Sequence, residues 1–302
     1  MCRARHVPLN TYIPGPSSDR NLEPRSFAER GTALSIRIQA AAAALFAATV
    51  AATAAHADLS EEELAKIAQN PVGNLISVPF QENLYLNAGP LEKNQSVLNI
   101  QPVIPIDINE DWNIITRTIL PVVSLPPYAP GQTRTNGIGD LQISAFLSPA
   151  KPGAWIWGVG AITQLPTHSN ALLGNDNTGF GPSFVVLHLE HGDPWVYGVL
   201  LNNVWSSNNS TAPSYNNGLI QPFLNFNFHS GAYLTSSPIL TVNWQAKGNQ
   251  QWTVPMGGGV GKIFHFGKLP VNSQLSMYYN VARPDFAPNW QVRLQVQLMF
   301  PK

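Results

Sequence analysis

The sequence predicts an all-β protein, a closed antiparallel transmembrane β-barrel of twelve strands with a short N-terminal helix after a signal peptide. Three observations predict it. Apolar and polar residues alternate along the last segment, long and short connections alternate between strands, and all eight tryptophans lie near predicted strand ends. Composition agrees, because only 11% of the residues are charged while 44% are hydrophobic, against about 25% charged in ordinary soluble domains.

The N-terminal part of the 302-residue chain has the features of a targeting segment. An alanine-rich apolar run follows Arg30 and Arg37 and ends in Ala55-His56-Ala57, the form of a signal-peptide cleavage site. We therefore expect residues 1–57 to be a leader and signal peptide. The only cysteine, Cys2, lies in that leader, so no disulfide is expected in the mature protein.

A short amphipathic helix and linker are predicted over 58–73, followed by an outer-membrane β-barrel over 74–302. Ser60 and Glu63 have capping-box spacing at the start of the helix, and Asn70-Pro71 ends it. Two positions are open for this helix, a peripheral one in the periplasm and a plug in the pore. The peripheral position is the one we expect.

Twelve segments have the length and the turn-forming boundaries of barrel strands. They are 74–86, 95–106, 112–123, 137–147, 154–165, 180–189, 195–204, 218–228, 232–244, 251–264, 271–280 and 289–300. Most connections alternate between long and short. This predicts long external loops and short periplasmic turns, with the tryptophans in two girdles at the interfaces.

The last segment shows which wall of the barrel faces lipid. From Trp290 to Phe300 the even-numbered residues are apolar and the odd-numbered ones are polar, except Met299. Successive strand residues point to opposite faces, and an arginine at mid-bilayer costs about 2–4 kcal/mol. The even face is therefore expected to contact outer-membrane lipid, with Arg293 inside. We also expect the barrel-assembly machinery to recognise this C-terminal strand ending in Phe300.

Strand parity also predicts the inner wall. Ten residues are expected in the lumen or its constriction: Asn99, Gln101, Arg117, Asp140, Gln142, Asn225, Asn243, Tyr278, Arg293 and Gln295. Charged groups on opposite sides of a lumen set a local field, so Arg117, Asp140 and Arg293 are the expected constriction, with Arg117 paired to Asp140. The amides favour neutral or weakly charged solutes.

Two sectors depart from this pattern. Glu82 falls on the lipid-facing parity, and a bulge near Pro79 is expected to turn it inward toward Arg293. Inward Ile156, Ile162, Val196 and Leu200 predict a partly apolar patch covered by a loop or by the N-terminal helix.

Short motifs along the chain add a family resemblance. They are LISVPFQ (75–81), NIQPVIP (99–105), DWN (111–113), GIGD (137–140), GFGPS (179–183), WTVP (252–255), GVGK (259–262) and the segment 293–301. With them the chain resembles the outer-membrane barrel family catalogued around the meta-pathway of phenol degradation. Its members are often labelled transporters, and some relatives carry the label neuromedin U. The resemblance covers 70–302 and implies a closed barrel and a transport role in the bacterial outer membrane, without naming a substrate.

The chain offers no pattern that favours catalysis or a cofactor. His168-Ser169-Asn170 lie on one loop, whereas triad members converge from separate segments. The other histidines lack metal-ligand spacing, and the glycine run 257–261 lacks the residues of a phosphate loop. We therefore expect no enzyme, no catalytic or cofactor-binding residues and no metal. With a net charge of zero we also expect no nucleic-acid partner.

Three hypotheses remain open for function. The first is a passive channel or transporter for small solutes, including aromatic or apolar ones. The second is a closed barrel with a structural or surface-binding role, its lumen packed by the helix and inward apolar residues. The third is a secreted glycan-binding β-sandwich. The solute and the oligomeric state are not specified by these patterns.

Overall fold

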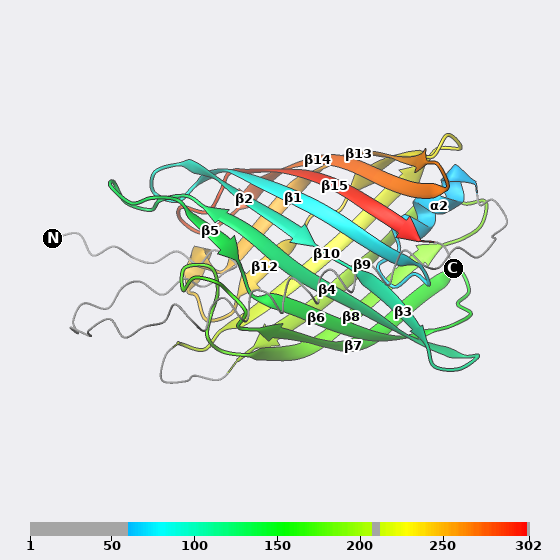
Figure 1. The fold of residues 1–302 in the computed structure, drawn as a ribbon, viewed down its shortest axis with the longest axis horizontal. Coiled ribbons are helices and arrows are strands. Elements are labelled where there is room, and N and C mark those ends of the chain that lie inside the picture. The colour runs from blue at the N-terminus through cyan, green and yellow to red at the C-terminus, as the bar shows by residue number, and fades with distance from the viewer. Residues whose placement is uncertain (1–59, 207–211, 301–302) are drawn as a thin grey trace.

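Antiparallel strands close into one barrel in the computed structural model, which describes residues 60–206 and 212–300 (Figure 1). Fifteen strand segments form twelve crossings, because β2/β3, β5/β6 and β11/β12 are each one crossing interrupted near Pro102, Asp140 and Pro238. The predicted fold class is confirmed, and each predicted strand lies within a few residues of an observed crossing. The leader predicted over 1–57 lies outside the described residues.

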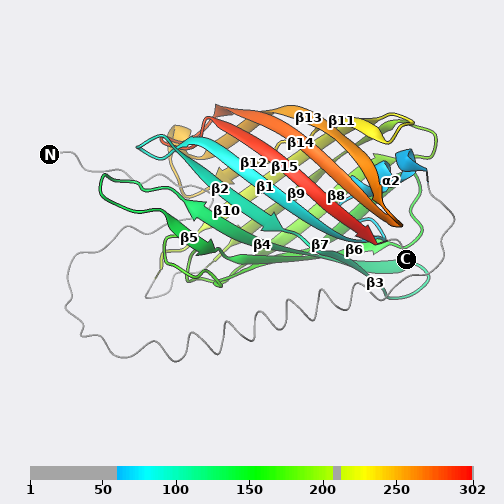
Figure 2. The same ribbon diagram turned by 45° about the horizontal axis from the view of Figure 1, so that its top comes forward.

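The strands have the following bounds: β1 Ile76–Ala88, β2 Lys93–Ile100, β3 Val103–Asp107, β4 Trp112–Leu125, β5 Thr135–Ile138, β6 Leu141–Pro149, β7 Trp155–Leu165, β8 Gly179–Leu189, β9 Trp195–Trp205, β10 Asn216–Asn227, β11 Ala232–Ser236, β12 Leu240–Asn243, β13 Trp252–Phe266, β14 Leu269–Ala282 and β15 Trp290–Phe300. The first and last strands pair from Ile76 opposite Phe300 to Leu86 opposite Trp290. This pairing leaves no free sheet edge, and Figure 2 shows the strands running obliquely to the long axis.

The two faces of each strand have the predicted polarity. In β15, Leu294 is 49% exposed while Arg293 is 2% exposed. Large apolar side chains are exposed around the outer wall, among them Leu224, Leu234 and Val260. A continuous exposed apolar wall around a polar interior is the arrangement of a barrel that meets hydrocarbon. No helix among the described residues is long and apolar enough to cross a membrane.

The prediction that Glu82 turns inward is wrong. The register of β1 with β15 is unbroken from Ile76 to Leu86, so no bulge forms near Pro79. Glu82 stays on the outer face opposite Leu294, and its Oε1 accepts a hydrogen bond from Ser96 Oγ at 2.7 Å. The neighbouring hydroxyl, and not the lumen arginine, stabilises this carboxylate.

The peripheral position predicted for the helix is also wrong. Helix α2, Glu61–Ala68, begins at the Ser60 capping box and lies against the barrel at the end that carries the short turns (Figure 1). Its buried Leu64 packs with inward-facing Tyr233, Ile263 and Met299. Met299 breaks the alternation of β15 because it completes this apolar contact inside the barrel. The helix therefore covers the lumen at the end with the short turns, the end predicted to be periplasmic.

A loop enters the barrel from the opposite end, the end predicted to be external. Leu173, in the connection 166–178, is buried against Val123 and Leu125 on the inner face of β4. Asn177 in the same loop donates to the carbonyl oxygens of Ala212 and Pro213. The described part of the lumen is thus narrowed at both ends.

Candidate solute cavity

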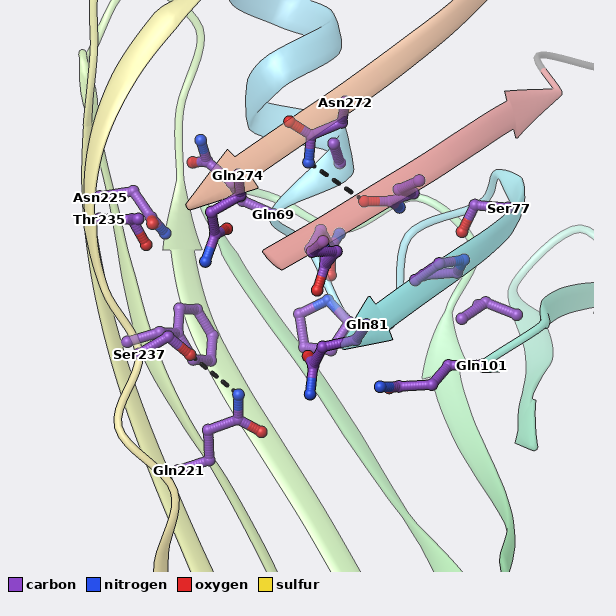
Figure 3. Close-up of a pocket in the computed structure, with 18 of the residues that line it drawn as sticks. Gln69, Ser77, Gln81, Gln101, Gln221, Asn225, Thr235, Ser237, Asn272 and Gln274 are labelled. Atoms are coloured by element: carbon purple, nitrogen blue, oxygen red, sulfur yellow. Dashed lines mark hydrogen bonds between the residues drawn. The ribbon is translucent and has the colours of Figure 1, made fainter. Parts of the chain in front are cut away.

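A polar cavity of about 130 Å³ lies inside the barrel, between the end of α2 and the inner faces of the strands. Amide side chains dominate its lining: Gln69, Asn70, Gln81, Gln101, Gln221, Asn225, Asn272, Gln274, Gln295 and Gln297. Figure 3 shows several of them projecting toward one another from different strands. Ser77, Thr235 and Ser237 add hydroxyl groups. Among the residues that the structure describes, Arg117 and Arg293 are the only charged ones in the lining.

The segment that follows α2 forms one end of the cavity. The Asn70 side chain accepts a hydrogen bond from the Val72 backbone N–H at 2.9 Å, a turn that ends the helix beside Pro71. Gln69 and Asn227 exchange two amide hydrogen bonds, at 2.7 and 3.2 Å. This reciprocal pair fastens the helix terminus to the end of β10, directly at the cavity.

Arg293 is held on the β15 side of the cavity by uncharged groups. Its Nε donates to Asn83 Oδ1 at 3.3 Å and its Nη1 to the Ser237 carbonyl oxygen at 2.9 Å. The guanidinium carbon lies 4.8 Å from the centre of the Tyr278 ring, a cation–π contact. Nη2 is buried and has no hydrogen-bond partner.

Arg117 approaches the same cavity from β4. Its Nη2 donates to Gln101 Oε1 at 2.6 Å, and Gln101 is fixed in turn because its backbone N–H donates to the Pro79 carbonyl oxygen at 2.9 Å. No ion pair joins either lumen arginine to a carboxylate in the described residues.

The predicted Arg117–Asp140 pair does not form. Arg117 is opposite Ser144 in the β4–β6 register, four residues from Asp140, which is about 13 Å along a strand. Asp140 instead contacts the external loop. Its Oδ1 lies 2.7 Å from His168 Nδ1 and its Oδ2 accepts from the Asn175 backbone N–H at 2.8 Å.

The structure separates the ten expected lumen residues into two groups. Gln101, Arg117, Asn225, Arg293 and Gln295 line the cavity. The remaining five lie outside its lining: Asn99, Gln142, Tyr278, Asp140 and Asn243.

Each of those five has another position or partner. Asn99 lies opposite Gln81 on the inner wall, and Gln142 donates to Gln164 at 3.0 Å. The ring of Tyr278 makes the cation–π contact with Arg293. Asn243 accepts from the Gln245 backbone at 3.0 Å in an external turn.

Some lining residues were not predicted. Gln69 lies in the linker and Ser237 at the interruption between β11 and β12, where no period of two applies. Gln221 donates to Ser237 Oγ at 2.8 Å (Figure 3), and strand parity alone identifies Gln221 as inward. Gln81, Asn272 and Gln297 also lie on regular strands with inward parity, so a fuller use of the period of two identifies them. Of these residues, only Gln69 and Ser237 depend on the path of irregular backbone.

An apolar sector lies beside the amides, where the sequence predicts it. Ile156, Val196 and Leu200 pack into one buried cluster with Val72 of the linker. Ile162 packs with Val204 and Tyr215 instead, beneath the external connection. Leu200, Phe223 and Val103 reach the cavity lining, so the chamber has a polar side and an apolar side.

The glycine run in β13 has a packing role. A Cβ at Gly261 would overlap the ring of Tyr233, whose Oη donates to Asn272 Oδ1 at 2.8 Å. The missing side chain lets this aromatic ring lie against the barrel wall. No group of His, Cys, Asp or Glu side chains suited to a metal ion occurs in the part of the chain that the structure describes.

The fold and the cavity define a twelve-stranded antiparallel barrel with an internal chamber. An outer membrane channel from Pseudomonas putida F1 has a similar structure, with a TM-score of 0.56, 18% sequence identity, and coverage of 82% of this chain and 99% of that one. This similarity shows a shared fold.

Two further barrels are less similar. Outer membrane phospholipase A from Escherichia coli matches with a TM-score of 0.41 and 12% identity over 81% of this chain and 99% of that one. The beta domain of the Bordetella autotransporter BrkA matches with a TM-score of 0.44 and 11% sequence identity, over 76% of this chain and 99% of that one. Neither a protein-family model nor the sequence of a curated protein matches the chain.

Proposed function

We propose that the protein lies in the bacterial outer membrane and is a passive channel for small solutes, including aromatic or apolar ones. The proposal rests on one observation: a polar chamber of about 130 Å³ lies inside a barrel whose outer wall is apolar. An aqueous or amide-lined interior behind a lipid-facing wall is the design of porin-type barrels. The shared fold with an outer membrane channel supports the proposal.

Passage through the barrel requires movement at its ends. At the periplasmic end the solute meets the Gln69–Asn227 amide pair, and at the external end it meets the loop fastened through Asp140 and His168. Within the chamber, amides exchange hydrogen bonds with a polar group while Leu200 and Phe223 contact an apolar body. No energy-coupling group is needed for movement down a concentration gradient.

A closed barrel with a structural or surface-binding role is the second candidate. The observation that favours it is the narrowing of both ends of the described lumen by α2 and the 166–178 loop. The two candidates differ in one respect: a channel opens at some rate, and a permanently packed barrel does not.

Planar-bilayer recording and liposome uptake test the channel. Gln69→Ala removes both amide hydrogen bonds, which are together worth about 1–2 kcal/mol, so the open fraction should rise about 5- to 30-fold. Gln245→Ala removes the same side chain at the external end and is the matched control. If wild type and Gln69→Ala both show neither conductance nor solute uptake, the channel proposal is wrong and the closed barrel is favoured.

A further inference from the structure

Arg293 has a hydrogen-bonding capacity that the protein does not use. The side chain is 2% exposed and lines the cavity. Asn83 and the Ser237 carbonyl occupy Nε and Nη1, whereas Nη2 is one of three buried side-chain polar atoms without a partner among the described residues. A buried charged donor is normally paired, because leaving it unpaired is costly. The empty position therefore suits an acceptor brought by a ligand.

The cavity also lacks a countercharge. Arg117 and Arg293 line it together, and no aspartate or glutamate of the described chain does. The two carboxylates that the sequence suggested as partners of the arginines are engaged elsewhere: Asp140 contacts His168, and Glu82 lies on the outer face beside Ser96. Two guanidinium groups around one small space create a positive potential, which attracts an anion and repels a cation.

The neighbouring groups restrict the chemistry of that anion. Guanidinium groups bind planar carboxylates well, since their donors are arranged as a fork. Gln101 and Gln295 add amide groups beside the arginines, while Leu200 and Phe223 form an apolar wall. A volume of about 130 Å³ is close to that of an engineered cavity of ~150 Å³ that admits benzene. A compact organic acid with one apolar group matches this space.

We propose that the cavity binds small monocarboxylate solutes, with Arg293 and Arg117 as the groups that recognise the carboxylate. This inference rests on the proposed function and names its solute class: the channel selects anions, and it selects an aromatic acid over the neutral amide of the same shape. It replaces the expectation of neutral or weakly charged solutes, which rested on the amides, because the described lining also carries two arginines and no carboxylate.

Binding and conduction test the proposal separately. Calorimetric titration of the purified full-length barrel in detergent compares benzoate with benzamide, which has nearly the same shape without the charge. Bilayer recording in a KCl gradient gives the reversal potential, hence the permeability ratio of chloride to potassium. Both measurements are made on wild type, Arg293→Gln, Arg293→Lys and Arg117→Gln, with Arg134→Gln as the control. Arg134 is an external-loop arginine that donates to the Asn94 and Ser124 carbonyl oxygens.

Wild type should bind benzoate at least tenfold more tightly than benzamide and should pass chloride in preference to potassium. Arg293→Gln and Arg117→Gln should each lose most of that preference, Arg293→Lys should retain part of it, and Arg134→Gln should not differ from wild type. Altered gel migration of the unboiled sample verifies that each variant is folded. Equal affinity for benzoate and benzamide in folded wild type overturns the carboxylate site even when the barrel conducts. Benzoate binding without any conductance supports the site and removes the channel.

Discussion

Replacing Leu64 by alanine tests whether packing of α2 closes the periplasmic end. Leu64 is 3% exposed and contacts the inward cluster of Tyr233, Ile263 and Met299. The substitution removes three carbon atoms, worth about 0.8 kcal/mol each, so docking should weaken by about 2.4 kcal/mol. At 1.4 kcal/mol per factor of ten, the undocked fraction should rise roughly 50-fold.

Trypsin cleavage after Lys66 measures the undocked fraction, because Lys66 is 3% exposed while α2 is docked. When opening and closing are fast, the cleavage rate follows the open population. The product that begins at Ile67, identified by mass spectrometry, should therefore form much faster in Leu64→Ala. Leu172→Ala, an exposed leucine in the external loop, is the matched control. An unchanged cleavage rate after Lys66 in Leu64→Ala would refute the argument that apolar packing holds the helix.

Three other predictions concern charge. The hydrogen bond from Lys66 holds the pKa of Glu62 below its ordinary value of 4.5. Both residues lie in α2, so the contribution of this pair to helix stability is complete above pH 4.5 and is lost as the pH falls through the lowered value; hydrogen-exchange protection of α2 should fall with it. Asp140→Asn should release the external loop, raising exchange there and leaving α2 unchanged, while equal exchange in both contradicts a local fastening. Leu294→Arg should reduce folding free energy in lipid vesicles by about 2–4 kcal/mol, whereas Leu172→Arg in the external loop, where the leucine is exposed, should have a much smaller effect; similar losses would contradict the assignment of the lipid face.

The period of two predicts most of this barrel because each strand separates lipid from water along its whole length. Polar Arg293 and apolar Leu294 are neighbours in sequence, and only one register gives both a suitable environment. Strand pairing also keeps one charged residue on the lipid-facing wall. Glu82 remains on the outer face because moving it inward would break the pairing of β1 with β15, which costs more than keeping one carboxylate beside the Ser96 hydroxyl.

Contacts between segments remote in sequence were not predictable in this way. Asp140 was assigned to the lumen by parity, but its partner His168 belongs to a loop whose path has no period. Gln69 reaches Asn227 across 158 residues of sequence. One residue pattern could have predicted the position of α2. Met299 is an apolar residue on the inward face of β15 and needs an apolar partner, which Leu64 on the apolar stripe of the helix supplies.

The two closures of the lumen share no residue, and this determines how the chamber can work. The periplasmic closure consists of apolar packing around Leu64 together with the Gln69–Asn227 amide pair. The external closure depends on charged and polar contacts to Asp140 and on Leu173. Among the described residues no contact joins one closure to the other, so we expect either end to open while the other stays shut. A solute held at the arginines would then leave by whichever end opens first, which is diffusion without a preferred direction.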